Sequence, residues 1–129
     1  MKPGLFALSV AALLTVPASI AAAPSDVNAQ RFYTEAVALQ GKGMAAMFDK
    51  RTKPMVAQMR DAGARARSAN EAASARGAPL YCVPEAARKK GLDPKAVIAM
   101  LGRLPESERR SLSLANAWQR ALVQTYPCR

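Results

Sequence analysis

The sequence contains no histidine, few aromatic residues and few acidic residues. Without histidine the chain cannot build a Ser-His-Asp triad, a Cys-His pair or a histidine-ligated metal site. Aromatic residues make up only 5% of the chain, so a row of rings on which nucleic-acid bases stack is also excluded. The acidic residues show no spacing typical of a catalytic carboxylate pair. These absences argue against an enzyme and against a nucleic-acid-binding protein.

Residues 1–22 have the composition of a secretory signal peptide. Lys2 is followed by an apolar run over residues 5–16 and then by small residues, which is the order of regions in such peptides. A membrane anchor, the alternative, needs about 20 apolar residues, and Pro17 interrupts this run. We expect cleavage after Ala21 or Ala22. The mature chain, residues 23–129, is then a single small domain, periplasmic or secreted.

The chain is strongly basic, with 19 Lys and Arg against 9 Asp and Glu and a formal net charge of +10. The basic residues form clusters at residues 50–53 and 88–90, with 109–110 as a third candidate. Such a surface attracts acidic proteins and other polyanions; alternatively, it only keeps the protein soluble. If a partner is acidic, the preferred binding residues are those closest to the first cysteine: Arg88, Lys89 and Lys90. We expect no membrane-surface role, because large aromatic and basic helix faces are lacking.

The apolar spacing is helical nearly everywhere and predicts an all-α fold, a small bundle of about four helices. The first helix, with Ser25 or Asp26 as its cap, carries an apolar face that includes Phe32 and Leu39. Gly41 and the glycine two residues later interrupt this helix. Three apolar residues continue its surface beyond the break: Met44, Met47 and Phe48.

A second helix is predicted over residues 54–76, with Pro54 in its first turn. Its apolar stripe repeats at offsets of four and three and consists of Met55, Met59, Ala62, Ala66, Ala69 and Ala73. Such a stripe is typical of a core or of a seam between helices, and a ligand groove is the alternative. Asp61 and Arg65, four residues apart, are expected to form a solvated ion pair.

Two further helices are predicted in the second half. Asp93 is expected to cap a helix that presents Val97 and Leu101 on one face. A short turn over residues 106–110 precedes the last helix, which is expected to begin near Ser111 or Ser113 and to bury Leu114, Trp118, Ala121 and Leu122.

The two cysteines, Cys82 and Cys128, are expected to form a disulfide, because exported chains commonly pair their cysteines. The alternatives are a redox pair, which usually has the spacing C-x-x-C, and a zinc site, for which ligands are lacking. A bridge between them would tie together the two ends of the third and fourth helices.

From residue 81 onward the sequence shows a recognisable pattern. It begins with Tyr-Cys-Val-Pro-Glu at residues 81–85, continues through a helix that ends over 101–105, and closes with Tyr-Pro-Cys at 126–128 after Trp118 and Leu122. This pattern resembles the C-terminal half of the Tai-type immunity proteins. That family consists of small periplasmic helical proteins that protect bacteria from cell-wall amidases injected by type VI secretion.

The resemblance covers residues 80–128 and implies a secreted helical domain tied by one disulfide. Only Cys82 and Cys128 carry over residue by residue. Family members usually have further cysteines in their first half, and this chain has none there.

Two hypotheses of function follow, and neither requires a cofactor or a metal. In the first, the protein is an exported, non-catalytic binding protein of the immunity class that blocks a secreted cell-wall amidase sterically. In the second, it is a basic envelope-associated structural or interaction protein of the periplasm. This second role would act through charge and the methionine and alanine stripe, with a homodimer as the candidate assembly.

Overall fold

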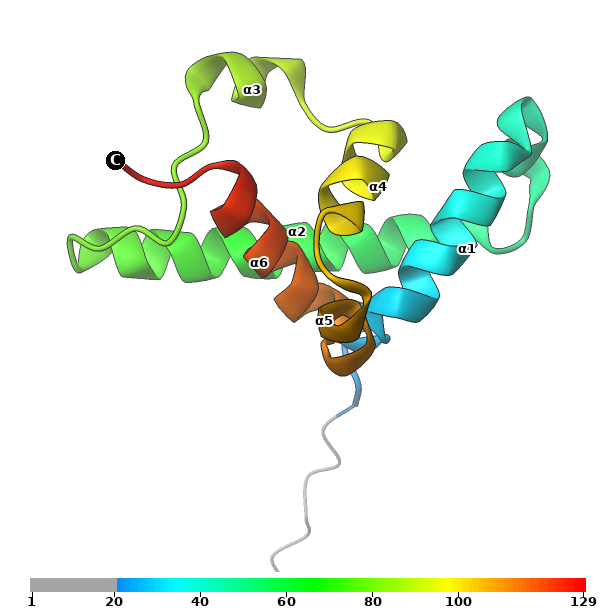
Figure 1. Ribbon diagram of the computed structural model, residues 1–129, viewed down its shortest axis with the longest axis horizontal. Coiled ribbons are helices and arrows are strands. Elements are labelled where there is room, and N and C mark those ends of the chain that lie inside the picture. Colours follow the sequence, from blue (N-terminus) through cyan, green and yellow to red (C-terminus); the bar gives the residue numbers. More distant parts are fainter. Residues whose placement is uncertain (1–20) are drawn as a thin grey trace, which may run out of the picture.

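The structure, a computed structural model, describes residues 21–129 (Figure 1). The first 20 residues, which hold most of the predicted signal peptide, lie outside the described residues. The described part is helical and contains no strand, so the all-α prediction is confirmed. Short helices α3 and α5 add to the four expected. In chain order the elements are η1 (Pro24–Asp26), α1 (Ala29–Gly41), η2 (Gly43–Phe48), α2 (Thr52–Ala75), α3 (Glu85–Lys90), α4 (Pro94–Gly102), α5 (Glu106–Ser111) and α6 (Leu114–Thr125).

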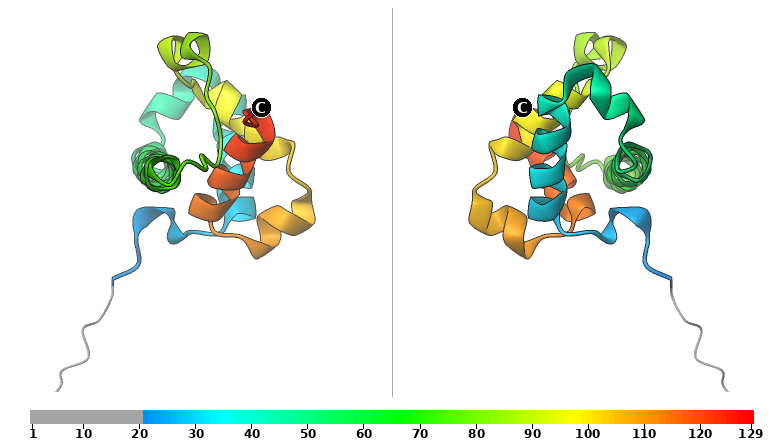
Figure 2. Two further views of the ribbon diagram at one scale, coloured as in Figure 1. Left: turned by 90° about the vertical axis from the view of Figure 1, so that its left-hand side faces the viewer. Right: turned by 90° about the vertical axis from the view of Figure 1, so that its right-hand side faces the viewer.

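Helix α2 runs along the longest axis of the molecule, and α1, α4 and α6 lie on one side of it (Figures 1 and 2). Its most extensive packing is against α6. Ala62, Ala66 and Ala73 are buried, whereas Met59 and Ala69 of the same stripe are half-buried. Because alanine side chains are small, α6 can approach α2 closely. The stripe is therefore largely a seam between helices.

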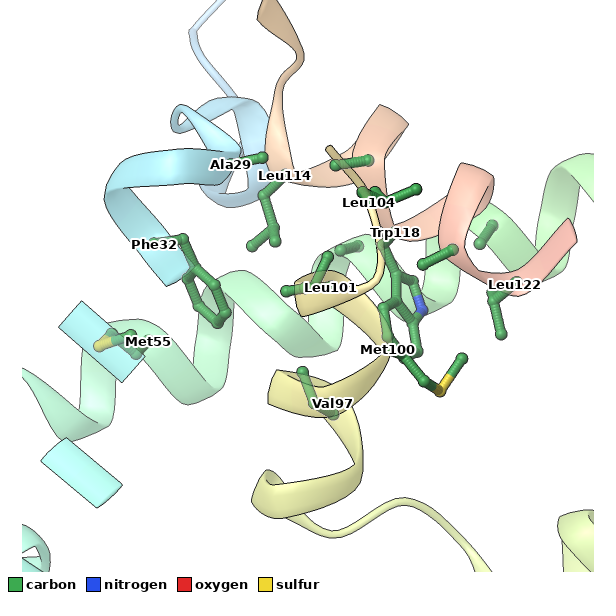
Figure 3. Close-up of a cluster of buried hydrophobic side chains, with 14 of the residues drawn as sticks. Ala29, Phe32, Met55, Val97, Met100, Leu101, Leu104, Leu114, Trp118 and Leu122 are labelled. Atoms are coloured by element: carbon green, nitrogen blue, oxygen red, sulfur yellow. The ribbon is translucent and has the colours of Figure 1, made fainter. Parts of the chain in front are cut away.

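The core draws on both halves of the chain (Figure 3). Trp118, Leu101 and Leu114 are its largest fully buried apolar side chains. Phe32 of α1 and Met55 of α2 belong to the same cluster. Burying a large apolar side chain contributes roughly 1.5–3 kcal/mol, so these few residues supply much of the stabilisation of an alanine-rich protein.

The beginnings of α1 and α6 are joined side by side. Asn28, and not Ser25 or Asp26 as predicted, caps α1, since its side chain accepts hydrogen bonds from the backbone of the first turn. Ser113 caps α6, as predicted. The backbone N–H of Leu114 donates to Val27 at 2.7 Å, and an isolated antiparallel bridge joins the two cap residues. This pairing fixes the entry of both helices.

The residues expected to cap α1 instead attach the N-terminal segment to α2. Ser25 is fully buried, and its backbone N–H donates to Asp61 Oδ2 at 3.0 Å. Arg65 donates to Asp26 Oδ1 at 2.8 Å, whereas its distance to Asp61 is 4.0 Å. The predicted pair is therefore present as a long, partly exposed contact, and both residues also belong to a network with η1. The Arg65 hydrogen bond lowers the pKa of Asp26, and the Ser25 hydroxyl lowers the pKa of Asp61.

Arg109 corrects the prediction of a third basic surface cluster, because its side chain is buried. Its guanidinium donates to the carbonyl oxygens at the C-terminal end of α4, including that of Leu101 at 3.2 Å, and to Gln30 Oε1 at 2.7 Å. It also lies over the ring of Tyr33, 4.3 Å from the centroid. The positive charge lies at the C-terminal end of α4, where it complements the helix dipole, and the guanidinium supplies a donor to the carbonyl of Leu104. Arg109 thus links α4, α5 and α1.

A disulfide joins Cys82 to Cys128, as predicted, with the two Cα atoms 5.0 Å apart. Beside it, the Cys82 N–H donates to the carbonyl of Tyr126 at 2.8 Å. The Asn70 side chain accepts from the N–H of Leu80 at 2.8 Å and donates to the carbonyl of Tyr81 at 3.0 Å. The extended segment after α2 is therefore held against both α2 and the C-terminus, so it does not serve as a free hinge.

Below about pH 8, the pH dependence of stability is expected to be confined to acid. The pKa values of Asp26, Asp49 and Asp61 lie below the ordinary value of 3.8 in the folded protein. Stabilisation from such groups is present above the unfolded-state pKa and is lost as the pH falls through the folded-state values. Since no histidine titrates between about pH 5 and 8, the free energy of unfolding should be nearly constant there and should fall below about pH 4. Urea unfolding measured between about pH 3 and 8 gives this free energy at each pH. A steep change of the free energy of unfolding between about pH 6 and 8 would contradict the prediction.

Candidate interaction surface

The predicted partner-binding residues Arg88, Lys89 and Lys90 form the last turn of α3, and all three are exposed. Two of them are engaged locally. The Lys89 ammonium lies 3.3 Å from Glu85 Oε1, and Arg88 Nε donates to the carbonyl of Val83 at 3.1 Å. The three residues therefore lie together. Among them, Lys90 forms neither an ion pair nor a side-chain hydrogen bond with another described residue.

A second surface lies at the other end of the molecule, where η2 projects beyond α1 (Figure 1). Met44, Met47 and Phe48 are 77%, 68% and 90% exposed. We call these three residues the apolar tip. The sequence placed them on a continued apolar surface, but their exposure to solvent was not foreseen. Exposed large apolar side chains grouped in this way are typical of interaction sites.

The apolar tip is held in place by polar contacts at its base. Gly43, at the beginning of η2, has a φ of 57°, which favours glycine and turns the chain away from α1. Asp49 receives hydrogen bonds from Lys42 at 2.7 Å and from Arg51 at 3.0 Å. The Thr52 hydroxyl donates to the carbonyl of Ala46 at 2.5 Å. The end of α1 and the beginning of α2 are thus joined beneath η2.

Asp49 is the central residue of this base. The guanidinium of Arg51, followed by the ammonium of Lys42, holds the pKa of Asp49 far below its usual range. Its carboxylate therefore stays charged at any ordinary pH and keeps both contacts. A tip fixed in this way loses little conformational entropy when it binds.

An apolar groove of about 700 Å³ lies next to the apolar tip, between α1, η2, α2 and α4. The largest side chains of its lining come from four helices and include Phe32, Leu39, Met55, Met59, Val97 and Trp118. Figure 3 shows several of these side chains projecting toward the interior of the helix arrangement. Val56 and Leu92, which also line the groove, are 50% and 49% exposed. The groove is thus open to solvent. Met55 and Met59, in the first part of the α2 stripe, line this groove, while the alanine part of the stripe packs against α6.

Exposed basic residues accompany the apolar tip and the groove. Lys50 and Lys53 follow the tip along the chain, and Arg60 lines the groove. None of the three forms an ion pair with another described residue. The basic cluster at residues 50–53 therefore lies beside the apolar tip, as its position directly after the tip in the sequence requires.

Apolar and basic side chains at one end of the molecule can hold a partner through both packing and charge. Phenylalanine and methionine are enriched at the centres of protein interfaces, and methionine adapts its shape to irregular surfaces. Within residues 21–129, no three carboxylate or cysteine side chains lie close enough together to hold a metal ion. No described helix is long and apolar enough to cross a membrane.

No protein-family model matches the chain, and neither a curated protein nor a solved structure matches it. The resemblance to the Tai-type immunity proteins therefore rests on the residue pattern from Tyr81 to Cys128.

Proposed function

We propose that this protein is an exported, non-catalytic binding protein that inhibits a secreted cell-wall amidase by blocking it sterically. The observation that carries the proposal is the apolar tip, in which three large apolar side chains are exposed on a firmly attached projection. The signal-peptide pattern supports export, and the pattern framed by Cys82 and Cys128 supports the immunity class.

The shape of the apolar tip fits a blocking role. Phe48 is 90% exposed, so burying its ring in a partner's cleft removes a large apolar area from water. Lys50 and Lys53 beside it favour a cleft with an acidic rim and accelerate association through long-range attraction. The three residues of α3 predicted earlier lie apart from this surface along the long axis (Figure 1). We therefore assign the main contact to the apolar tip.

Replacing Phe48 with serine should weaken partner binding by about 30-fold or more, the effect of losing an interface anchor worth about 2 kcal/mol. Stability should change little, because the ring has few contacts within the protein. The test is capture of partners from bacterial envelope and secreted fractions with the oxidised mature protein, followed by titration of the captured enzyme. Val123→Ser on α6, another exposed apolar position, is the matched control and should bind normally. Equal binding by the Phe48→Ser variant would contradict the proposal.

The alternative, an envelope-associated protein acting through its charge, is distinguished by salt. Interactions between exposed charges weaken strongly as salt rises. A single stoichiometric partner that stays bound at high salt supports inhibition. A broad set of partners that is lost at high salt supports the alternative. The alternative also predicts that replacing Arg88, Lys89 and Lys90 with glutamine removes these partners.

A further inference from the structure

The groove beside the apolar tip has the character of a small-molecule site. Its volume of about 700 Å³ lies within the range of ligand pockets, roughly 300–1,000 Å³. Its lining is mostly apolar, with Met55 and Met59 along one wall and Val97 on another. Trp118, only 2% exposed, forms part of its floor. A slender apolar chain would find both the volume and the apolar surroundings that it needs.

One exposed cation lines this groove, and two others lie on the helices that form its walls. Arg60 lines it and is exposed, and Lys53 lies seven residues earlier, on the same face of α2. On the opposite wall, Lys95 of α4 is exposed and lies three residues before Ile98, which lines the groove. None of these cations forms an ion pair with another described residue.

The one acidic side chain in the lining already has a structural role. Asp93 Oδ1 accepts a hydrogen bond from the backbone N–H of Ala96 at 2.7 Å and so caps α4. The groove therefore combines an apolar interior with Arg60, the one lining side chain whose charge is free to meet a ligand. A ligand that complements both features has an apolar chain and an anionic head.

We propose that this groove binds a fatty acid, with the alkyl chain along Met55, Met59 and Val97 and the carboxylate at Arg60. A guanidinium can donate two parallel hydrogen bonds to a carboxylate, which favours this head group over a neutral one. The inference does not rest on the proposed function: the groove and the apolar tip are adjacent but distinct, and each can fail separately.

The chain provides its own reporter, because Trp118 is its only tryptophan. The experiment titrates the oxidised mature protein with dodecanoate below its micelle concentration and follows tryptophan emission. Dodecyltrimethylammonium, with the same chain and a cationic head, is the comparison probe. We expect a saturable change at one dodecanoate per protein and none with the cationic probe. No saturable change with dodecanoate, or equal binding of both probes, would overturn the proposal.

Gly63 allows the groove to be filled without disturbing its surroundings. It lines the groove, and a Cβ atom built on it would meet no other atom within 4 Å. Gly63→Leu should therefore abolish dodecanoate binding and leave the melting temperature at or above that of the parent, since leucine favours helix more than glycine does. Gly41→Leu is the matched control: Gly41 is also helical and open but does not line the groove. Undiminished binding by the Gly63→Leu variant would contradict the assignment.

The head-group contact is tested by Arg60→Gln, with Arg67→Gln as control, because Arg67 is exposed on the same helix but does not line the groove. Loss of a charge-assisted hydrogen bond predicts dodecanoate binding about tenfold weaker for the first variant. Equal affinity of the two variants would overturn the role of Arg60. These measurements need no protein partner, so their outcome is separate from that of the capture experiment.

Discussion

Replacing both cysteines, Cys82→Ser together with Cys128→Ser, is expected to lower the free energy of unfolding by about 4 kcal/mol. The disulfide joins residues 46 apart in the sequence, and breaking it releases a long loop in the unfolded chain. A loss of this size is a large part of the 5–15 kcal/mol typical of native proteins. The double variant should therefore be marginally folded or unfolded at 37 °C.

Urea unfolding of the oxidised protein, of the reduced protein and of the double serine variant measures this effect. The reduced protein should resemble the double variant, because both lack the same cross-link. A difference of less than about 1 kcal/mol between oxidised and reduced forms would contradict the prediction. It would mean that the hydrogen bonds around Tyr81 already hold the C-terminus in place.

Arg109→Met is expected to lower the free energy of unfolding by about 1–3 kcal/mol, although it replaces one long side chain by another. The substitution removes the buried donor to the carbonyl oxygen of Leu104, which follows α4. The carbonyl oxygen of Leu101 also loses Arg109 but still accepts from the backbone N–H of Leu104. It also removes the contact with the Tyr33 ring. Buried polar groups that lose their partner cost the full energy of their desolvation.

The neighbouring residue supplies the matched control. Arg110 is exposed and pairs with Glu106 at 2.6 Å, four residues earlier on the same short helix. Such exposed pairs contribute little, so Arg110→Met should change the free energy of unfolding by less than about 1 kcal/mol. Arg109→Lys should recover only part of the loss, because an ammonium lacks the planar fork of donors. Equal effects of the two methionine substitutions in urea unfolding would contradict the buried role of Arg109.

Local patterns in the sequence were sufficient to predict the later helices. The side chain of Asp93 before a proline, and that of Ser113 before a run of apolar residues, mark helix starts through hydrogen bonds made within a few residues. The disulfide was predicted from the number of cysteines and the export pattern. These features depend on residues close in sequence or on composition, so no knowledge of the fold was required.

The features that sequence reasoning missed depend on contacts between distant segments. From the sequence alone, Arg109 is predicted to be a surface charge. In the structure it is buried against the end of α4. The sequence predicts Ser25 as a helix cap, but its backbone N–H donates a hydrogen bond to Asp61, 36 residues away. Phe48 continues an apolar spacing, but it follows the turn at Gly43 and lies exposed to solvent. The available sequence signal for the apolar tip was the segment GMAAMF, which begins with Gly43 and is followed by a run of charged residues.

An inhibition assay tests most directly whether the apolar tip blocks an enzyme. Hydrolysis of peptidoglycan by the captured amidase is measured with increasing amounts of the oxidised protein, and in parallel with the Phe48→Ser variant. We expect hydrolysis to stop at a fixed molar ratio of parent protein to enzyme. With the Phe48→Ser variant, hydrolysis should continue at the same ratio. Undiminished hydrolysis while the parent protein stays bound would contradict it.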